Sequence, residues 1–343
     1  MRWSFANIEA KQILGENPLQ MMDSPVLVKE NPIRQVFKCG KLYFKYDMRF
    51  FNGLKKEFRH AMNISAAGIP AVKHLAVSRH WLITQSAENT VELAAFVREN
   101  VPSREMLESL GNFINILKKN NLKHTDLHSG NILYDTVQNS FLLVDLCSAN
   151  ISSARWASDE KHYAHLVMEL RRYLPRKELY PLLQICSQSS LEELFDKTLN
   201  SDTVQTLNSW QKRKSQILSG YKKFIRKQDD VIFAADAPTD INNSTEISGN
   251  GMEYMLLHHF LELNHIPHKR VYAVDGNTVY VEQDDTQSTP VTEEIFADFS
   301  ERLAICGIAS APQDWCISNG KIKFINLDSA LKQCGFSESR ENR

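Results

Sequence analysis

The sequence predicts an α+β chain with a strand-rich front, a helix-rich middle and a third part that repeats features of the first. Three observations support this. Residues 26–47 contain three runs of β-branched and aromatic residues, which is typical of strands. Apolar residues over 157–227 recur mostly at helical spacing. Residues 264–282 repeat the pattern of residues 67–85. The length of 343 residues suits one large domain or two modest ones.

Composition narrows the class of protein further. Hydrophobic residues make up 43% and charged residues 24% of the chain, which excludes a disordered or collagen-like protein. The 40 Lys and Arg residues are balanced by 41 Asp and Glu residues. Proteins that bind duplex nucleic acid through its phosphates usually carry a basic excess, so we expect no nucleic-acid partner.

The six cysteines form no C-x-x-C pair, and no apolar run reaches the ~18 residues that a membrane-spanning helix requires. The first residues lack the apolar segment of a secretory signal. We therefore expect a cytoplasmic protein with reduced thiols.

The front of the chain divides into clear elements. A turn at Cys39-Gly40 separates the second and third strands of residues 26–47. Further elements are expected as a helix over 50–67 that stops at Gly68-Ile69-Pro70, two strand-like runs up to residue 85, helical segments over 90–121 with Ser103 as an N-cap, a polar loop over 122–131, and two short apolar runs after it.

Residues 228–250 are rich in Asp, Asn, Ser and Thr and lose apolar periodicity, which is typical of a linker. We therefore predict a first domain over 1–228, a linker over 229–250 and a third part over 251–343. This third part resembles the front: Ile69-Pro70 and Ile266-Pro267, like Ala76-Val77 and Ala273-Val274, lie at one constant offset. The pattern indicates an internal duplication.

Three polar residues carry the strongest functional signal. Asp126 and Asn131 lie five residues apart on the polar loop, and Asp145 follows after an apolar strand. Phosphoryl transfer needs a group that orients or deprotonates the acceptor hydroxyl, and oxygen ligands for Mg²⁺ that bridge the nucleotide phosphates. We predict that Asp126 is catalytic and that Asn131 and Asp145 bind Mg²⁺, with Asp135 as the alternative acid.

Phosphoryl transfer also needs a cation on the nucleotide phosphates. Lys45 lies near the end of the third strand, and Glu57 follows twelve residues later on the next helix. We predict an ion pair between them that holds Lys45 in place to bind ATP. Lys41 is the fallback for this role, and Lys38 comes after it.

These residues resemble the protein-kinase-like superfamily. Residues 124–133, HTDLHSGNIL, are similar to the catalytic loop of its small-molecule and lipopolysaccharide branch. The front, with Val36-Phe37, Gly40, Tyr43 and Lys45, is most similar to the lipopolysaccharide core kinase family of 3-deoxy-manno-octulosonic acid (Kdo) and heptose kinases. The resemblance covers residues 25–226. It implies a bilobed protein-kinase-like fold, followed here by a partial, degenerate kinase-like repeat, and ATP-dependent phosphorylation of a sugar hydroxyl on a lipid-linked glycan.

The chain departs from typical protein kinases. No G-x-G-x-x-G loop precedes the first strand pair, Asp145 is followed by Leu-Cys, and no A-P-E segment follows, so no phosphorylation-controlled activation loop is expected. Two alternatives stay open. One is a soluble small-molecule kinase similar to aminoglycoside or choline phosphotransferases, and the other is a non-catalytic nucleotide-binding regulator.

Residues 210–227 combine apolar residues with seven Lys and Arg residues, and their spacing predicts a basic amphipathic helix. Such a helix suits peripheral contact with the anionic surface of the inner membrane, next to a lipid-anchored acceptor. The alternative is a terminal helix with a solvated basic face.

The second copy departs from the first at its polar positions. Asp314 and Asn319 keep the five-residue spacing, Pro312 replaces the loop histidine, and Asn326 stands in the place of Asp145. No strand lysine equivalent to Lys45 is found. We therefore predict that this copy transfers no phosphate, although Asp328 is a further candidate metal ligand.

Overall fold

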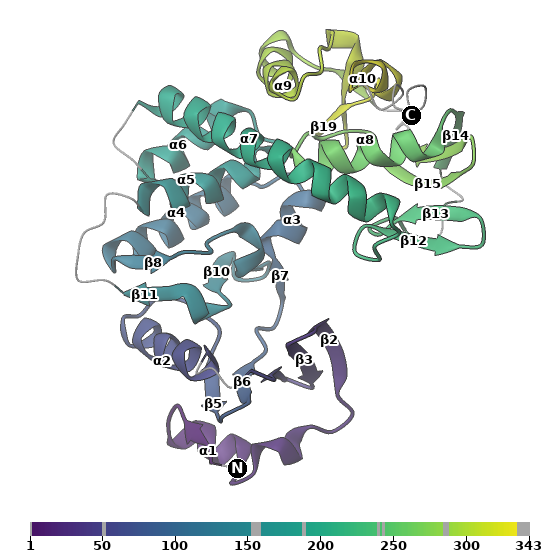
Figure 1. Cartoon of the computed structure of the whole chain (residues 1–343). Coiled ribbons are helices and arrows are strands. Elements are labelled where there is room, and N and C mark those ends of the chain that lie inside the picture. Colours follow the sequence, from purple (N-terminus) through teal and green to yellow (C-terminus); the bar gives the residue numbers. More distant parts are fainter. Residues whose placement is uncertain are drawn as a thin grey trace. The chain divides into compact units, whose positions relative to one another are not determined.

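The computed structural model describes residues 2–49, 53–151, 159–186, 190–238, 241, 244–283 and 288–334. The chain divides into two compact units, shown with their elements in Figure 1. Unit 1 contains Met1–Leu166 and Pro181–Gln188, and unit 2 contains Val167–Tyr180 and Ser189–Arg343. No helix among the described residues has the length and apolar content needed to cross a bilayer.

Unit 1 begins with a six-stranded antiparallel sheet of order β1-β5-β6-β4-β3-β2. Its strands are β1 (Ser4–Phe5), β2 (Val26–Asn31), β3 (Arg34–Cys39), β4 (Leu42–Asp47), β5 (His74–Val77) and β6 (Trp81–Gln85). The predicted turn between β3 and β4 is present, and Gly40 occupies it with a φ of 54°. That left-handed conformation favours glycine because a side chain strains it.

Each face of this sheet is covered by a helix. Helix α1 (Ile8–Leu14) contributes Leu14 to an apolar cluster with Phe44 and Ile83. Helix α2 (Gly53–Ala66) contributes Leu54 to a cluster with Val77 and Leu82. Because side chains alternate along a strand, Phe44 faces α1 and its neighbour in β4 faces α2.

The second half of unit 1 holds the polar loop that the sequence singles out. Ser103 caps α4 as predicted, because its side chain accepts a hydrogen bond from the Met106 amide at 3.2 Å. The elements are β7 (Thr90–Glu92), α3 (Leu93–Glu99), α4 (Arg104–Lys119), β8 (Leu122–His124), the 3-10 helix η2 (Ser129–Asn131), β9 (Ile132–Asp135), β10 (Ser140–Leu143), η3 (Leu146–Ser148), β11 (Ala149–Ile151) and the start of α5 (Asp159–Met168).

Unit 2 contains a five-stranded sheet of order β12-β13-β15-β16-β14 and a three-stranded sheet of order β17-β18-β19. Its helices and strands are η4 (Glu169–Arg172), the start of α6 (Arg176–Cys186), α7 (Leu191–Leu218), β12 (Ile225–Gln228), β13 (Val231–Ala234), β14 (Ser244–Ser248), α8 (Gly251–Leu263), β15 (Val271–Asp275), β16 (Thr278–Glu282), β17 (Thr289–Pro290), α9 (Glu293–Ile305), η5 (Pro312–Asp314), β18 (Trp315–Ser318), β19 (Lys321–Phe324) and α10 (Leu327–Cys334).

Two features of this region differ from the sequence-based expectation. The basic helix predicted over 210–227 is wrong, because α7 ends at Leu218 and Gly220 turns the chain with a φ of 79°. Trp210 and Ile217 lie on the apolar side of α7 and are buried in the apolar core of unit 2, in agreement with the alternative of a helix whose basic face is solvated. The segment 229–250 also holds β13 and β14, so it is not the unstructured linker that its polar composition indicates. The boundary between the predicted domains stays a prediction.

The internal duplication is visible in the hydrogen bonding. In unit 1 the Leu143 amide donates to the Pro70 carbonyl, and in unit 2 the Phe324 amide donates to the Pro267 carbonyl. Isolated parallel bridges follow the same correspondence, at Ala71–Leu143 and His268–Phe324. The two copies therefore share these backbone contacts, and the predicted fold, a kinase-like domain with a partial repeat, is confirmed.

Candidate active site

The strand and helix patterns bring Lys45 and Glu57 together. Lys45 follows Phe44 in β4 and therefore lies on the face of the sheet that α2 covers. Glu57 is one of four buried residues of α2, with a side chain only 4% exposed. A carboxylate buried this deeply requires a partner, and Lys45 provides it.

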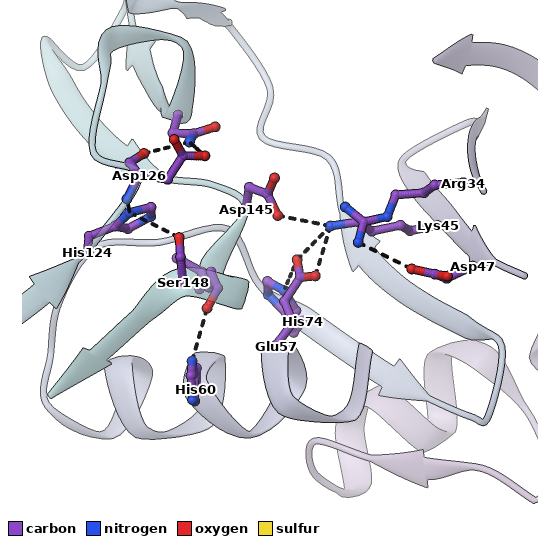
Figure 2. Close-up of polar contacts among 12 residues, drawn as sticks. Arg34, Lys45, Asp47, Glu57, His60, His74, His124, Asp126, Asp145 and Ser148 are labelled. Atoms are coloured by element: carbon purple, nitrogen blue, oxygen red, sulfur yellow. Dashed lines mark hydrogen bonds and ion pairs between the residues drawn. The ribbon is translucent and has the colours of Figure 1, made fainter. Parts of the chain in front are cut away.

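Lys45 is the centre of the polar network in Figure 2. Its Nζ donates to Glu57 Oε1 at 3.0 Å and Oε2 at 2.8 Å, which is the ion pair that the sequence predicts. The same Nζ donates to Asp145 Oδ1 at 3.1 Å. A strand lysine, a helix glutamate and the aspartate that follows β10 are thus joined through one ammonium group.

Burial and charge oppose each other in this network. Burial disfavours the charged form of Lys45, but Glu57 and Asp145 outweigh it and raise the pKa of the ammonium above its ordinary value. Burial likewise opposes the charge of Glu57, yet His74 and Lys45 lower the pKa of its carboxyl. The pKa of Asp145 is also lowered, because Lys45 outweighs the effect of burial. All three groups are therefore charged at neutral pH.

The polar loop after β8 presents Asp126. Its side chain is 65% exposed, whereas Asn131 is buried. Asn131 Nδ2 donates to the Asp126 carbonyl at 2.8 Å and lies 3.4 Å from Asp126 Oδ2. The amide group of Asn131 thus fixes the loop that carries Asp126, and its nitrogen faces that loop.

The two loop histidines pack within the loop. His124 is buried, and its Nδ1 accepts from the Asp126 amide at 3.3 Å. Burial lowers the pKa of His124 and favours the neutral ring. His128 Nδ1 accepts from the Gly130 amide at 3.0 Å, while its Nε2 lies 3.8 Å from Asp126 Oδ1. These contacts support the loop from inside.

Asp145 lies at a turn and has an unusual backbone conformation. Its φ of 50° and ψ of 59° lie in the left-handed region, immediately before η3. The carbonyl of Leu146 in η3 accepts a hydrogen bond from His60 Nδ1 of α2 at 3.2 Å. Helix α2 therefore contacts both Lys45, through Glu57, and the turn that carries Asp145.

One cavity of about 810 Å³ joins these residues. Lys45, Glu57, Asn131 and Asp145 all line it. Asp126 is not among its lining residues, but it contacts Asn131 directly at the edge of this lining. The remaining lining includes apolar side chains from both halves of unit 1, namely Val28, Val36, Val72, Leu133 and Val144.

The donor groups in this cavity fit Mg²⁺. Asp145 offers a charged carboxylate that is 36% exposed, and Asn131 turns its amide oxygen away from the Asp126 loop. Among the described residues no cluster of three His, Cys, Asp or Glu side chains could hold a metal. Mg²⁺ commonly uses only one or two protein ligands beside phosphate oxygens and water, so two ligands suffice.

The alternative residues have other contacts, although Lys38 and Lys41 also line the cavity. Asp135 Oδ1 accepts from the amides of Val137 and Gln138, both at 2.9 Å, and so caps the β9–β10 turn. Lys41 is well exposed and pairs with Glu88 at 2.5 Å. Lys38 lines the cavity, with its Nζ 5.8 Å from the centre of the Tyr43 ring.

Strand register identifies the equivalent positions in the second copy. Ile247 pairs with Val279 as Lys45 pairs with Leu82, so an apolar residue stands where the lysine would be. This agrees with the expectation that the copy lacks a strand lysine. The Ile325 amide donates to the Asp314 carbonyl as the Val144 amide donates to Asn131.

This register corrects the sequence alignment of the second loop. Asp314 is equivalent to Asn131, not to Asp126, and Ala309 stands five residues earlier in the place of Asp126. Asn319 lies in the β18–β19 turn, and Pro312 begins η5 as Ser129 begins η2. The equal spacing of Asp314 and Asn319 was misleading because it spans a different element. Asn326 does stand in the place of Asp145.

The polar residues of the second copy satisfy one another. Asp314 accepts from the Ala311 amide and from Asn326 Nδ2, both at 2.7 Å. Asp328 accepts from the Tyr254 hydroxyl. Nearby, Lys323 Nζ lies 2.6 Å from Glu282 Oε1 beside a small cavity of about 10 Å³.

Two residues of the first site escaped the sequence-based reasoning. His74 lies in β5, almost fully buried, with its Nε2 3.6 Å from Glu57 Oε1. Arg34 begins β3 and lines the same cavity. The alternation of Arg34, Val36 and Lys38 along β3 was a signal for the latter, since alternate residues share one face.

Comparison with known proteins agrees with this geometry. Residues 35–180 match the model of the lipopolysaccharide kinase (Kdo/WaaP) family. Comparison of the sequence with curated proteins finds no match.

Several solved structures resemble the chain at low identity. WaaP in complex with acyl carrier protein is 16% identical, with a TM-score of 0.43, 64% of this chain covered and 99% of that one. The streptomycin–ATP complex of APH(2″)-IIa is 13% identical, with a TM-score of 0.41 and coverages of 63% and 93%. A choline/ethanolamine kinase family protein from Mesorhizobium loti is 12% identical, with a TM-score of 0.41 and coverages of 62% and 87%. From its motifs and the family match, the chain contains a phosphotransferase domain that is similar over residues 35–180 to the lipopolysaccharide kinase (Kdo/WaaP) family.

Proposed function

We propose that this protein transfers the terminal phosphoryl group of ATP to a sugar hydroxyl of a lipid-linked glycan of the lipopolysaccharide inner-core type. The observation that carries the proposal is the joining of Lys45 to both Glu57 and Asp145 in one cavity, with Asn131 and Asp126 beside it. The acceptor class follows from the family match over residues 35–180.

Each residue of the site has a different role in phosphoryl transfer. The Lys45 ammonium binds nucleotide phosphate, and Glu57 keeps it oriented toward the cavity. Asp145 and Asn131 hold Mg²⁺, which neutralises phosphate charge when it is bound. Asp126 accepts a hydrogen bond from the acceptor hydroxyl and aligns its oxygen with the phosphorus, since its carboxylate is exposed and fixed by Asn131.

The residues expected to bind the nucleotide and the residue expected to bind the acceptor differ in solvent exposure. Lys45 and Glu57 are buried, so a nucleotide phosphate bound there is screened little by solvent. Asp126 faces solvent, which allows a large glycan to approach it. The exposed position of Asp126 therefore leaves room for a glycolipid as well as for a small molecule.

The test is phosphorylation of defined acceptors. Purified protein, ATP and Mg²⁺ would be incubated with inner-core glycolipid, an aminoglycoside or choline, and each product would be analysed by mass spectrometry. We expect one added phosphate on the glycolipid and none with Asp126→Asn. Phosphorylation of only the small molecules would identify the small-molecule alternative. ATP binding without transfer to any acceptor would identify the nucleotide-binding regulator.

A further inference from the structure

The hairpin that borders the nucleotide cavity has an unusual turn. Kinases commonly cover the phosphates with a glycine-rich loop, in which bare backbone approaches the ligand. Here β2 and β3 are joined through Pro32 and Ile33, and residues 26–39 contain no glycine. Pro32 has no backbone N–H, so this turn lacks a donor that a phosphate would use.

Arg34 follows directly on this turn and shares a face with Lys45. It pairs with Asp47 in the β3–β4 register, and Lys45 lies two residues before Asp47. Diagonal neighbours on one face of a sheet are within reach of each other's long side chains. Figure 2 shows the two side chains extending side by side toward Asp145.

The surroundings of Arg34 leave one of its N–H donors unused. Asp47 accepts from the Arg49 amide, Nε and Nη2 at 3.0, 3.1 and 2.9 Å, and from Arg34 only through one Nη2 at 3.2 Å. Arg49 thus largely compensates Asp47. The Arg34 Nε is buried and has no hydrogen-bond partner among the described residues.

An anion would satisfy this arrangement. Two cations on one sheet face repel each other, and a buried N–H without an acceptor is unfavourable. The guanidinium group can offer parallel N–H donors to two phosphate oxygens, which an ammonium cannot do. Arg34 lies in the lining of the same cavity as Lys45 and Asp145, so one phosphate chain can reach all three.

We propose that Arg34 binds the phosphates of the nucleotide beyond the α-phosphate and thereby takes the part of the missing glycine-rich loop. This inference rests on the proposed function, because it assumes a nucleoside triphosphate in the cavity. It assigns the recognition of a triphosphate to a side chain instead of backbone amides.

Equilibrium binding of ATP with Mg²⁺, and of AMP, to the purified full-length protein tests the inference. Arg34→Ala should weaken ATP binding by about 10- to 100-fold, the usual worth of a hydrogen-bonded charge, and leave AMP binding unchanged. Arg34→Lys should recover part of the loss. Arg104→Ala, which removes an exposed arginine paired with Glu108 on α4, is the matched control and should change neither affinity.

A purely structural role would give a different pattern. If Arg34 only supported Asp47, then Arg34→Ala and Asp47→Asn would weaken ATP and AMP binding alike, and the inference would be overturned. Unchanged ATP binding by Arg34→Ala would overturn it as well. That result would leave the proposed function intact if Asp126→Asn still abolished transfer, whereas a wild-type protein without ATP binding would overturn both.

Discussion

At the scale of single residues, the site depends on compensation of buried charge. Lys45 balances two carboxylates, and Asp47 receives two arginines. Because each charged group has its partner in place, the side chains hold one geometry before any ligand arrives. Removal of one member leaves another buried and unpaired, so substitutions here affect both affinity and stability.

The role of Asp126 is testable through turnover. Asp126→Asn should lower the rate of phosphoryl transfer by about 10²–10⁴, the usual contribution of a general base. ATP affinity should persist, because Asp126 lies outside the residues that line the cavity. Steady-state kinetics and nucleotide binding would be measured on the same preparation. A variant with wild-type turnover would rule out the assigned role.

The role of Asp145 is testable through ligand-dependent stabilisation. Asp145→Ala removes the carboxylate that we assign to Mg²⁺, so the rise in Tm that ATP produces in the presence of Mg²⁺ should disappear. Asp135→Ala is the comparison, and it should retain the rise because Asp135 caps a turn. The opposite result, loss with Asp135→Ala alone, would transfer the ligand role to Asp135.

The lowered pKa of Asp47 predicts that the free energy of unfolding depends on pH. Hydrogen bonds from Arg49, against the opposing effect of burial, lower the pKa of Asp47 to about 2 from 3.8. A lowered folded-state pKa adds stability above the unfolded-state pKa, which is lost as the pH falls toward about 2. Asp47→Asn should therefore cost about 2 kcal/mol in urea unfolding at pH 7. This difference should shrink between pH 5 and pH 3; a constant difference would contradict the assignment.

At the scale of elements, the two units have related strands and helices but different side chains at the polar positions. In unit 1, α2 carries Glu57 against the lysine strand, and the cavity beside it is open. In unit 2, α8 carries Tyr254 in the place of Glu57, and its hydroxyl donates to Asp328. The β2–β3 hairpin of unit 1 also has no counterpart among the described strands of unit 2, where β14 lies at the edge of the sheet.

The first residues of α2 and α8 give a matched pair of glycine substitutions. A Cβ on Gly251 would lie 2.7 Å from the Gly276 carbonyl oxygen and 2.8 Å from Val274 Cβ, whereas a Cβ on Gly53 would meet nothing within 4 Å. Gly251→Ala should therefore lower the free energy of unfolding by about 1–3 kcal/mol, as overpacking does. Gly53→Ala should be neutral or slightly stabilising. Equal effects in denaturant unfolding would argue against the close approach.

At the scale of the whole molecule, the chain divides into two units, and each has an apolar core. Unit 2 has an apolar core of its own, with Trp210 and Ile217 from α7 and Phe260 from α8. Truncation after residue 239 would remove α8 and its sheet partners and leave the first two of these residues without their packing. A truncation that removes unit 2 should therefore remove α7 as well, because α7 belongs to that unit.

The second copy should carry no chemistry. Asp314→Ala should leave turnover near the wild-type value, because the copy has Ile247 and Ala309 in place of Lys45 and Asp126. It should still lower the free energy of unfolding by about 1–3 kcal/mol, since Asn326 Nδ2 and the Ala311 amide lose their acceptor. Turnover and urea unfolding measure the two effects separately. A loss of turnover as large as that of Asp126→Asn, with folding intact, would indicate a second active site.

The sequence by itself determined the features that depend on local pattern. Alternation and turn residues predicted β3, β4 and their turn at Gly40, and helical spacing predicted α2 and α4. The pairing of Lys45 with Glu57 was also predictable, because the loop motif around Asp126 made a kinase-like arrangement the expected one. The duplication followed from Ile-Pro and Ala-Val pairs at one offset.

Only the tertiary structure decided the features that depend on strand pairing and burial. Residues 210–227 have a helical pattern, yet Gly220 ends the helix and Ile225 begins a strand that pairs with β13. The segment 229–250 supplies two strands because its few apolar side chains, Ile232 of β13 and Ile247 of β14, pack against the core of unit 2, and sheet hydrogen bonds pair both strands with their neighbours. Asp314 could be aligned correctly only through its backbone contact with Ile325. Arg34 and His74 joined the site for the same reason: cross-strand neighbours are distant in sequence, and their meeting is fixed by register.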